Sequence, residues 1–225
     1  MTSGLAAPGI SGAAGLRRRE DAVKRALDLI IATAATVVLA PVLVALWLWI
    51  RLDSPGPAIF RQQRLGRDAR PFTIYKFRTM RVDTDDAVHR AYVTQLLTSD
   101  APQAGGESGL FKLENDPRIT RAGHWLRRTS LDELPQLINV LRGEMSLVGP
   151  RPALAWEAEL YDAAHRRRFE VPPGLTGLWQ VSGRSELTMR QALDLDLDYV
   201  RRKGLGLDVA IILRTLPSLL RSQAR

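Results

Sequence analysis

An adjacent pair of carboxylates, Asp132 and Glu133, lies in a short segment that also carries arginines and a proline. This segment, residues 127–136, reads RRTSLDELPQ. Two neighbouring carboxylates repel each other, so a fold that places both in one pocket needs a cation or a proton to share the site. The arginines indicate that an anion also comes there, because guanidinium groups match phosphate oxygens in pairs. Carboxylate, divalent metal and phosphate together predict phosphoryl-transfer chemistry.

The same pair also has a purely structural explanation. Ser130 and Glu133 have the spacing of a capping box, and acidic residues at a helix start interact favourably with the helix dipole. Pro135 fits a second arrangement better, in which Asp132 itself is the N-cap and the proline lies in the first turn. In both arrangements the pair lies at the positive end of a helix, which also attracts phosphate. The residues alone leave capping and catalysis open.

Several basic residues are candidates for a phosphate clamp. Lys76 and Arg78 alternate with aromatic residues on a predicted strand, so we expect their side chains on one face. Arg127 precedes Asp132 by five positions, and Arg151 stands between two prolines that stiffen its backbone. Each of these residues has the alternative of a solvated surface cation, because the chain is rich in arginine.

A hydrophobic run from Leu29 to Ile50 follows a basic cluster at 17–25. The run is long enough to span a bilayer, for which about 20 residues suffice. Pro41 lies near its middle, where proline removes a helix hydrogen bond. Basic residues flank both ends, which favours both ends on the cytoplasmic side. A helix broken at Ala40 and Pro41 that enters one leaflet and returns satisfies both facts, and the alternative is a spanning helix kinked by the proline.

Composition narrows the class of protein. The chain has 225 residues, enough for one domain with its own core plus an appendage. The net charge is +8, from 32 basic and 24 acidic residues, which suits nucleic acid, anionic lipid headgroups or phosphorylated substrates. The absence of cysteine excludes disulfides and thiolate metal sites. The glycines form no Walker or dinucleotide-binding pattern, so neither an ATPase nor an NAD enzyme is indicated.

The rest of the chain predicts a β-hairpin followed by helices. The hairpin strands are 58–62 and 71–79, with turn residues at 66–68. A basic amphipathic helix is predicted from Leu207 to Arg225, either on an anionic membrane or packed on the core. A polar, glycine-rich loop is predicted at 98–109. Further helices are predicted at 84–97, 119–128, 132–142, 154–168 and 188–203.

Four motifs in order resemble the bacterial sugar transferases, the monotopic phosphoglycosyl transferases. Residues 127–152, RRTSLDELPQLINVLRGEMSLVGPRP, resemble the core signature of that family. The others are YKFRTM at 75–80, DPRIT at 116–120 and GLTGLWQVSGR at 174–184. Several long motifs in one order are far more specific than any one alone. Members of the family move a sugar-1-phosphate from a nucleotide sugar to a membrane polyprenyl phosphate.

The resemblance implies roles for the acidic pair. Asp132 is expected to be the nucleophile of a double-displacement reaction with a covalent aspartyl-phosphosugar intermediate. Glu133 is expected to be a ligand of Mg²⁺, the expected cofactor. The resemblance also implies a set of substrate-binding residues, of which Arg78 has the weakest support: Lys76, Arg78, Arg127, Arg151 and Arg184. Asp196 is a weaker candidate, interpreted as a structural partner of an arginine.

The expected fold class is α+β and mostly helical. It combines a re-entrant N-terminal membrane helix with a compact cytoplasmic catalytic domain that has a small β-hairpin and amphipathic interfacial helices. The expected divisions are a disordered tail at 1–16, the membrane helix kinked at Pro41 at 17–52 and the catalytic domain at 53–225. The resemblance implies the cytoplasmic face of a bacterial inner membrane as the location.

The expected partners are a UDP-linked nucleotide sugar, polyprenyl phosphate and membrane lipids, without nucleic acid, and with downstream glycosyltransferases as further candidates. The expected product starts exopolysaccharide, capsule, O-antigen or glycoprotein glycan synthesis. Two alternatives stand beside this function. One is a membrane-tethered basic binding protein without catalysis. The other is a membrane phosphatase or nucleotide-sugar hydrolase, in which water replaces the lipid acceptor.

Overall fold

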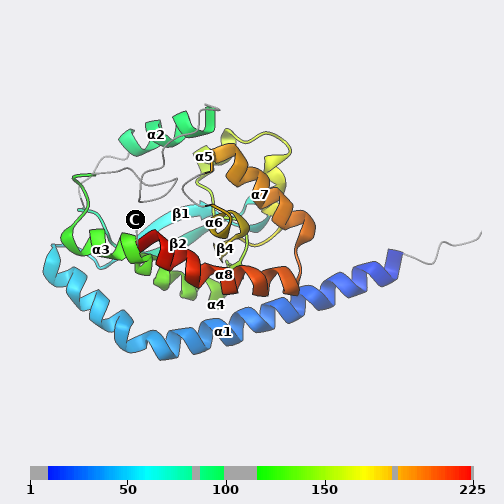
Figure 1. Ribbon diagram of the computed structural model, residues 1–225, viewed down its shortest axis with the longest axis horizontal. Helices are drawn as coiled ribbons and strands as arrows, with labels where there is room; N and C mark the ends of the chain where they lie inside the picture. The colour runs from blue at the N-terminus through cyan, green and yellow to red at the C-terminus, as the bar shows by residue number, and fades with distance from the viewer. Residues whose placement is uncertain (1–9, 83–86, 99–115, 184–186, 224–225) are drawn as a thin grey trace, which may run out of the picture.

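One long helix runs beneath a domain of shorter helices and small sheets (Figure 1). The computed structural model describes residues 10–82, 87–98, 116–183 and 187–223. The α-helices are α1 (Ile10–Asp53), α2 (Ala87–Thr98), α3 (Arg121–Thr129), α4 (Leu137–Arg142), α5 (Ala155–Glu159), α6 (Leu178–Val181), α7 (Met189–Arg202) and α8 (Leu205–Gln223). The 3-10 helices are η1 (Arg67–Ala69), η2 (Leu131–Gln136) and η3 (His165–Glu170). The strands are β1 (Ile59–Leu65), β2 (Pro71–Phe77), β3 (Ser146–Val148) and β4 (Gly174–Thr176). The predicted α+β, mostly helical class with a small hairpin is confirmed.

Helix α1 is long and bent. It begins at Ile10, inside the segment 1–16 that the sequence predicts to be a tail. Figure 1 shows two limbs of unequal length that meet at an angle, and Pro41 lies inside the helix. A proline removes a backbone donor and clashes with the preceding turn, so it accounts for a bend in a helix of this length. The helix is continuous through Ala40 and Pro41, and the re-entrant path through a membrane stays a prediction.

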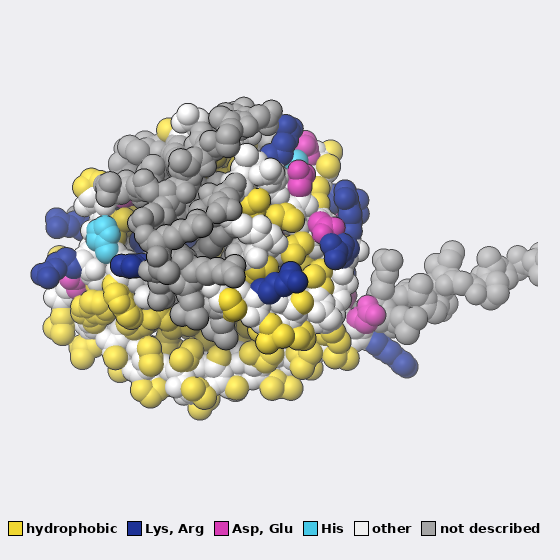
Figure 2. Space-filling view, in the orientation of Figure 1, with side chains coloured by type: hydrophobic (Ala, Val, Ile, Leu, Met, Phe, Trp, Pro, Cys, Tyr) yellow, Lys and Arg dark blue, Asp and Glu magenta, His cyan; other side chains and the backbone are white. Residues whose placement is uncertain are grey.

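The outer face of α1 exposes large apolar side chains, which form a band along the lower edge of the molecule in Figure 2. Among the described residues, the stretch Arg19–Asp53 is long and apolar enough to cross a membrane, although length and composition alone are weak evidence. Only 11% of its most apolar window is buried, whereas the core helix of a soluble protein is mostly buried. The exposed apolar residues of α1 include Ile30, Val37, Val38, Val44, Trp47, Leu48, Trp49 and Leu52. A band of this kind indicates contact with lipid or with another protein.

The inner face of α1 packs on the domain. Ala32 is fully buried in a cluster that includes Val140 and Val148. Ile50 is fully buried in a second cluster, which includes Phe77 and Leu126. These contacts bring α1 against α3, α4 and β3. The helix is therefore part of the domain's core along one side while its other side stays apolar and exposed.

The predicted hairpin is confirmed. Strands β1 and β2 pair antiparallel from Ile59 opposite Phe77 to Leu65 opposite Pro71. Strands β3 and β4 form a separate parallel pair, which the sequence analysis did not predict. Gly174 on β4 is required there, because a Cβ at that position would overlap the backbone of Gly149. The glycine lets the two parallel chain segments approach closely at the point where β3 ends.

The predicted helices 119–128, 188–203 and 207–225 correspond to α3, α7 and α8. The predicted helix 84–97 corresponds to α2, which begins at Ala87. Outside the described residues lie the first three positions of that prediction, 84–86, and most of the predicted loop at 98–109.

The prediction of one helix over 154–168 is wrong, because α5 ends at Glu159 and η3 begins only at His165. The chain turns between them so that Tyr161 is buried against Phe169. The predicted helix 132–142 is divided into two segments: η2, which contains Pro135 and ends at Gln136, and α4, which begins at Leu137.

A glycine at the start of α3 generates a stability prediction. A Cβ at Gly123 would overlap the Thr79 carbonyl oxygen, whereas a Cβ at Gly206 on α8 would meet nothing. We expect Gly123→Ala to lower the free energy of unfolding by about 1–3 kcal/mol, the usual cost of overpacking. Gly206→Ala, the matched control, should be neutral or stabilising by about 0.5–1 kcal/mol. Denaturant unfolding in detergent measures both, and equal effects would contradict the close packing of α3 on Thr79.

Candidate active site

The acidic pair lies at a sharp turn between two helical segments. Helix α3 ends at Thr129, and Ser130 adopts the left-handed conformation, with φ 57°. The chain then enters η2, whose first turn contains Asp132 and Glu133. The Ser130 side chain makes no capping hydrogen bond, and the N-cap of α4 is Gln136. Both capping arrangements considered for the pair are therefore wrong, because the Ser130 side chain caps nothing and Asp132 lies inside η2 and not at an N-cap.

The two carboxylates have different surroundings. Asp132 is buried, with 6% of its surface exposed, whereas the Glu133 side chain is 31% exposed. Lys76 Nζ donates to Glu133 Oε1 at 2.8 Å, and the Gln136 amide donates to Glu133 Oε2. The structure thus brings Lys76 of β2 to Glu133. The role of each residue toward a substrate stays a prediction.

Arg127, in the last turn of α3, contributes positive charge beside the pair. Asp132, Asp116 and Glu133 are all within electrostatic range of its guanidinium. Burial lowers the pKa of Arg127, and these carboxylates oppose that shift. A guanidinium stays charged at neutral pH in such surroundings. Arg127 therefore reduces the repulsion between the neighbouring acids.

Asp116 fixes the turn that precedes α3. Its carboxylate accepts from Arg118 Nε at 2.9 Å and from Arg118 Nη2 at 2.8 Å. Hydrogen bonds from Arg118 hold the pKa of Asp116 below its ordinary value. Thr120 then caps α3, since its side chain accepts from Gly123 N at 3.0 Å. The motif DPRIT thus positions the helix that carries Arg127.

Two buried arginines hold the loop that carries Arg151. Arg168 Nη2 donates to the Arg151 carbonyl at 2.8 Å and to Asp196 Oδ2 at 2.6 Å. Arg64 Nη1 donates to the Pro152 carbonyl at 3.3 Å. Burial lowers the pKa of Arg64 to about 10, and Arg151 adds to that effect while Glu133 opposes it. The charges of Arg151 and Glu133 therefore both act on the region around Arg64.

The predicted position of Arg78 is wrong. The sequence predicts that it shares a strand face with Lys76, but β2 ends at Phe77. The Arg78 guanidinium is buried and donates to the Pro55 carbonyl at 2.6 Å and to the Ser54 carbonyl at 2.7 Å. It therefore closes the C-terminal end of α1 and does not face the acidic pair. The remaining predicted residue, Arg184, lies outside the described residues.

Asn139 of α4, which has no role in the prediction from sequence, bonds this helix to the hairpin. Asn139 is fully buried. Its Oδ1 accepts from Tyr75 N at 3.1 Å, and its Nδ2 donates to the Thr73 carbonyl at 2.7 Å. The signal available was one amide residue inside the apolar run LINVL, at the spacing of one helical turn after Gln136. These bonds fix Lys76, the next residue of β2, relative to the helical segment that carries Glu133.

Arg168 was also missed. Arg168 has no predicted site role from sequence, and it is buried in the structure. It pairs with Asp196, which agrees with the interpretation of Asp196 as the partner of an arginine. A run of three consecutive basic residues, 166–168, gives no sign of which one points inward.

The donor chemistry of the pair fits a Mg²⁺ ion that is shared with a substrate. Among the described residues, no group of three His, Asp or Glu side chains is placed to hold a metal by itself. Mg²⁺ is commonly held by one or two carboxylates together with substrate phosphate oxygens and water. Glu133, which is partly exposed, can supply one such oxygen.

Comparison with known proteins identifies the family. The sequence profile described as Bacterial sugar transferase matches residues 19–222, so the chain belongs to that family. It is 44% identical over 194 residues to "Galactosyl transferase CpsE" of Streptococcus agalactiae, covering 86% of this chain and 41% of that protein. It is 43% identical over 208 residues to "UDP-glucose:undecaprenyl-phosphate glucose-1-phosphate transferase" of Caulobacter vibrioides, covering 89% and 70%. It is 37% identical over 195 residues to "Exopolysaccharide production protein ExoY" of Rhizobium meliloti, covering 87% and 84%. The chain thus spans less than half of the streptococcal relative.

The lowered pKa of Asp116 generates a pH prediction. A carboxylate with a depressed folded pKa stabilises the fold above its ordinary pKa of 3.8 and loses that contribution as the pH falls through the folded value. We expect Asp116→Asn to lower the free energy of unfolding by about 1–3 kcal/mol at pH 7, and the loss to shrink below pH 3.8. Asp198→Asn, which breaks an exposed pair with Arg202, should change the free energy of unfolding by about 0–1 kcal/mol. A loss for Asp116→Asn that is equal at every pH would contradict this linkage.

Proposed function

We propose that the protein transfers a sugar-1-phosphate from a nucleoside diphosphate sugar, expected to be a UDP-sugar, to a polyprenyl phosphate. The observation that carries the proposal is the buried Asp132 beside a Glu133 that Lys76 holds, with Arg127 in electrostatic range of both. Family membership supports it, and so does the name of the Caulobacter relative, which states a UDP-glucose donor and an undecaprenyl-phosphate acceptor.

The proposed reaction has two displacements at one phosphorus. In the first, a carboxylate oxygen of Asp132 bonds to the phosphorus that bears the sugar, and the bond to the nucleoside monophosphate breaks. In the second, a phosphate oxygen of the polyprenyl carrier attacks the same phosphorus, and the Asp132 carboxylate leaves unchanged. Dividing one difficult transfer into two steps through a covalent intermediate is the general advantage of a nucleophilic side chain. The burial of Asp132 keeps bulk water away from the intermediate.

The neighbouring residues bind and orient the phosphates. Glu133 would hold Mg²⁺, which offsets charge on the diphosphate when it is bound. Lys76 keeps Glu133 in place and is itself a cation of the kind that binds phosphate. Arg127 and Arg151 supply guanidinium groups that match phosphate oxygens in pairs. Holding both substrates in this geometry lowers the entropic cost of their reaction.

The exposed face of α1 supports the proposed acceptor and location. An exposed apolar helix face beside the domain suits a reaction in which one substrate is soluble and the other is a lipid. We place the enzyme at the cytoplasmic face of a bacterial inner membrane, where its product would start the assembly of a polysaccharide. The two relatives at 44% and 43% identity are named for galactose and for glucose. The proposal therefore names a hexose-1-phosphate and no particular sugar.

Removal of the nucleophile tests the reaction by kinetics. We expect Asp132→Asn to reduce release of the nucleoside monophosphate by about 10³-fold or more, as is typical when a nucleophile is lost. Asp198→Asn on the surface of α7 is the matched control and should keep full activity. The measurement is mononucleotide release from a panel of nucleotide sugars, with and without polyprenyl phosphate. Full turnover by Asp132→Asn would refute the mechanism, and turnover that is indifferent to polyprenyl phosphate would indicate a hydrolase.

The metal role of Glu133 is tested by titration. We expect Glu133→Gln to raise the Mg²⁺ concentration for half-maximal activity by about 10-fold or more, because an amide oxygen lacks the charge of a carboxylate. Chelation by EDTA should abolish the activity of the wild-type protein, and added Mg²⁺ should restore it. Glu159→Gln on α5 is the control. An unchanged Mg²⁺ requirement in Glu133→Gln would remove this residue from the metal site.

A further inference from the structure

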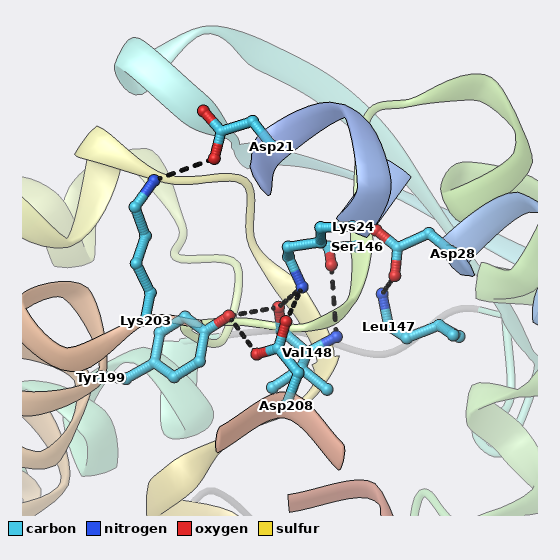
Figure 3. Close-up of polar contacts among 9 residues, drawn as sticks. All are labelled: Asp21, Lys24, Asp28, Ser146, Leu147, Val148, Tyr199, Lys203 and Asp208. Carbon is cyan, nitrogen blue, oxygen red and sulfur yellow. Dashed lines mark hydrogen bonds and ion pairs between the residues drawn. The ribbon is translucent and has the colours of Figure 1, made fainter. Parts of the chain in front are cut away.

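One turn of α1 is bonded to the interior of the domain. The basic residues before the apolar run suggest, from sequence, charge that lies outside a membrane. In the structure, Lys24 is mostly buried, and its Nζ donates to Asp208 Oδ2 at 2.6 Å and to the Val148 carbonyl at 3.2 Å (Figure 3). One turn further, the buried Asp28 accepts from Leu147 N at 3.1 Å. Both residues thus contact the backbone of β3.

Arg25 contacts the segment that follows the acidic pair. Its Nη1 donates to the Val140 carbonyl at 2.6 Å, and its Nη2 donates to the Leu141 carbonyl at 3.0 Å. These carbonyls belong to the last turn of α4, where helical carbonyls lack partners within the helix. The Val140 carbonyl also accepts from the C-cap Gly143 N at 3.0 Å. Helix α4 begins directly after η2, which carries Asp132. Arg25 therefore holds the far end of the unit that carries the nucleophile.

The contacts of Lys24 lie at the end of β3, just before the loop that carries Arg151. Val148 is the last residue of β3, and Arg151 follows three positions later. Tyr199 Oη lies 3.0 Å from the Val148 carbonyl and 2.8 Å from Asp208 Oδ1. Burial and the Asp208 charge raise the pKa of Tyr199, which keeps its hydroxyl protonated. Figure 3 shows Lys24, Tyr199 and Asp208 converging on this end of β3.

We propose that Lys24, Arg25 and Asp28, here called the α1 latch, are positioning residues that set the acidic pair and the Arg151 loop relative to each other. This inference rests on the proposed function. Each latch residue bonds to backbone atoms, and those atoms lie at both ends of residues 140–148, the segment that joins α4 to β3. Backbone contacts fix the path of the chain more directly than side-chain packing does. Residues of the membrane helix itself therefore complete the geometry of the catalytic site.

The partners of the latch explain why its charge matters. Lys24 faces a carboxylate that is 8% exposed at the side chain, and removing one member of a buried pair leaves the other charge uncompensated. Arg25 makes charge-assisted bonds to two carbonyls, a type stronger than neutral hydrogen bonds. By contrast, Lys203 of the α7–α8 junction pairs with Asp21 of α1 at 3.2 Å in an exposed position. That pair joins the same helix to the domain without touching residues 140–148, so it is a natural control.

The first test is kinetic. We expect Lys24→Met and Arg25→Met to lower kcat about 10-fold at saturating nucleotide sugar. The comparison uses variants that are membrane-integrated and whose thermal midpoint in detergent stays above the assay temperature. Arg25→Lys should retain most of the activity, because it still donates to a carbonyl with a positive charge. Lys203→Met should have wild-type kcat. A lowered thermal midpoint with unchanged kcat in Lys24→Met and Arg25→Met would show that the latch only stabilises the fold, and would overturn the proposal.

The second test needs no activity. The chain has no cysteine, so Glu20→Cys on α1 and Ile138→Cys on α4 can carry a pair of nitroxide labels at two exposed positions. We expect the distance distribution between the labels to be narrow in the parent and broad when Arg25→Met is added, but unchanged when Lys203→Met is added. An unchanged distribution with Arg25→Met overturns the latch. Broadening in a protein without any transferase activity would leave the latch standing and refute the proposed function alone.

Discussion

The site depends on cations that face two carboxylates which would otherwise repel each other. Lys76 bonds Glu133 directly, and Arg127 lies in electrostatic range of both acids. The cations come from different elements: Lys76 from the hairpin and Arg127 from α3. The fold must therefore bring a strand and a helix end to one point. Asn139 of α4 is buried and bonds to the backbone of β2, and α4 directly follows η2, which carries the two acids.

Four arginines of this chain are directed inward, toward the backbone of the domain. Arg64, Arg78, Arg168 and Arg25 all donate to backbone carbonyls. Hydrogen bonds from charged donors contribute about 1.5–3 kcal/mol each, whereas exposed ion pairs such as those on the surface of α7 contribute about 0–1 kcal/mol. The inward arginines therefore decide the shape of the site. They close the end of α1, hold the Arg151 loop and cap α4.

Local sequence patterns predicted the helices and strands that are stabilised by residues close together in the chain. The helix predicted from position 188 is confirmed as α7, where Thr188 and Gln191 form a capping box. The hairpin is confirmed because alternation and the turn residues act within about 20 residues of chain. The predicted helix 154–168 failed because the burial of Tyr161 against Phe169, a tertiary contact, overrides helical periodicity.

The candidate site was predictable only in part, because tertiary contacts decide where several of its side chains point. The acidic pair is recognisable from residue type and spacing, the family resemblance adds Lys76, and the structure brings Lys76 to Glu133. Arg78 was assigned to the wrong site and Arg168 to none, because an arginine on a surface and an arginine that holds a distant carbonyl look the same in sequence. The direction of a long side chain depends on elements far away along the chain, such as Pro55 for Arg78 and Asp196 for Arg168.

The central claim is that Asp132 becomes covalently bonded to a phosphosugar. The most direct measurement is intact-protein mass spectrometry after incubation with a nucleotide sugar and Mg²⁺ in the absence of polyprenyl phosphate, followed by peptide mapping. We predict one added phosphosugar per chain, located on Asp132 and removed when polyprenyl phosphate is supplied. An active protein that shows no adduct, or one that carries it on another residue, would contradict the account.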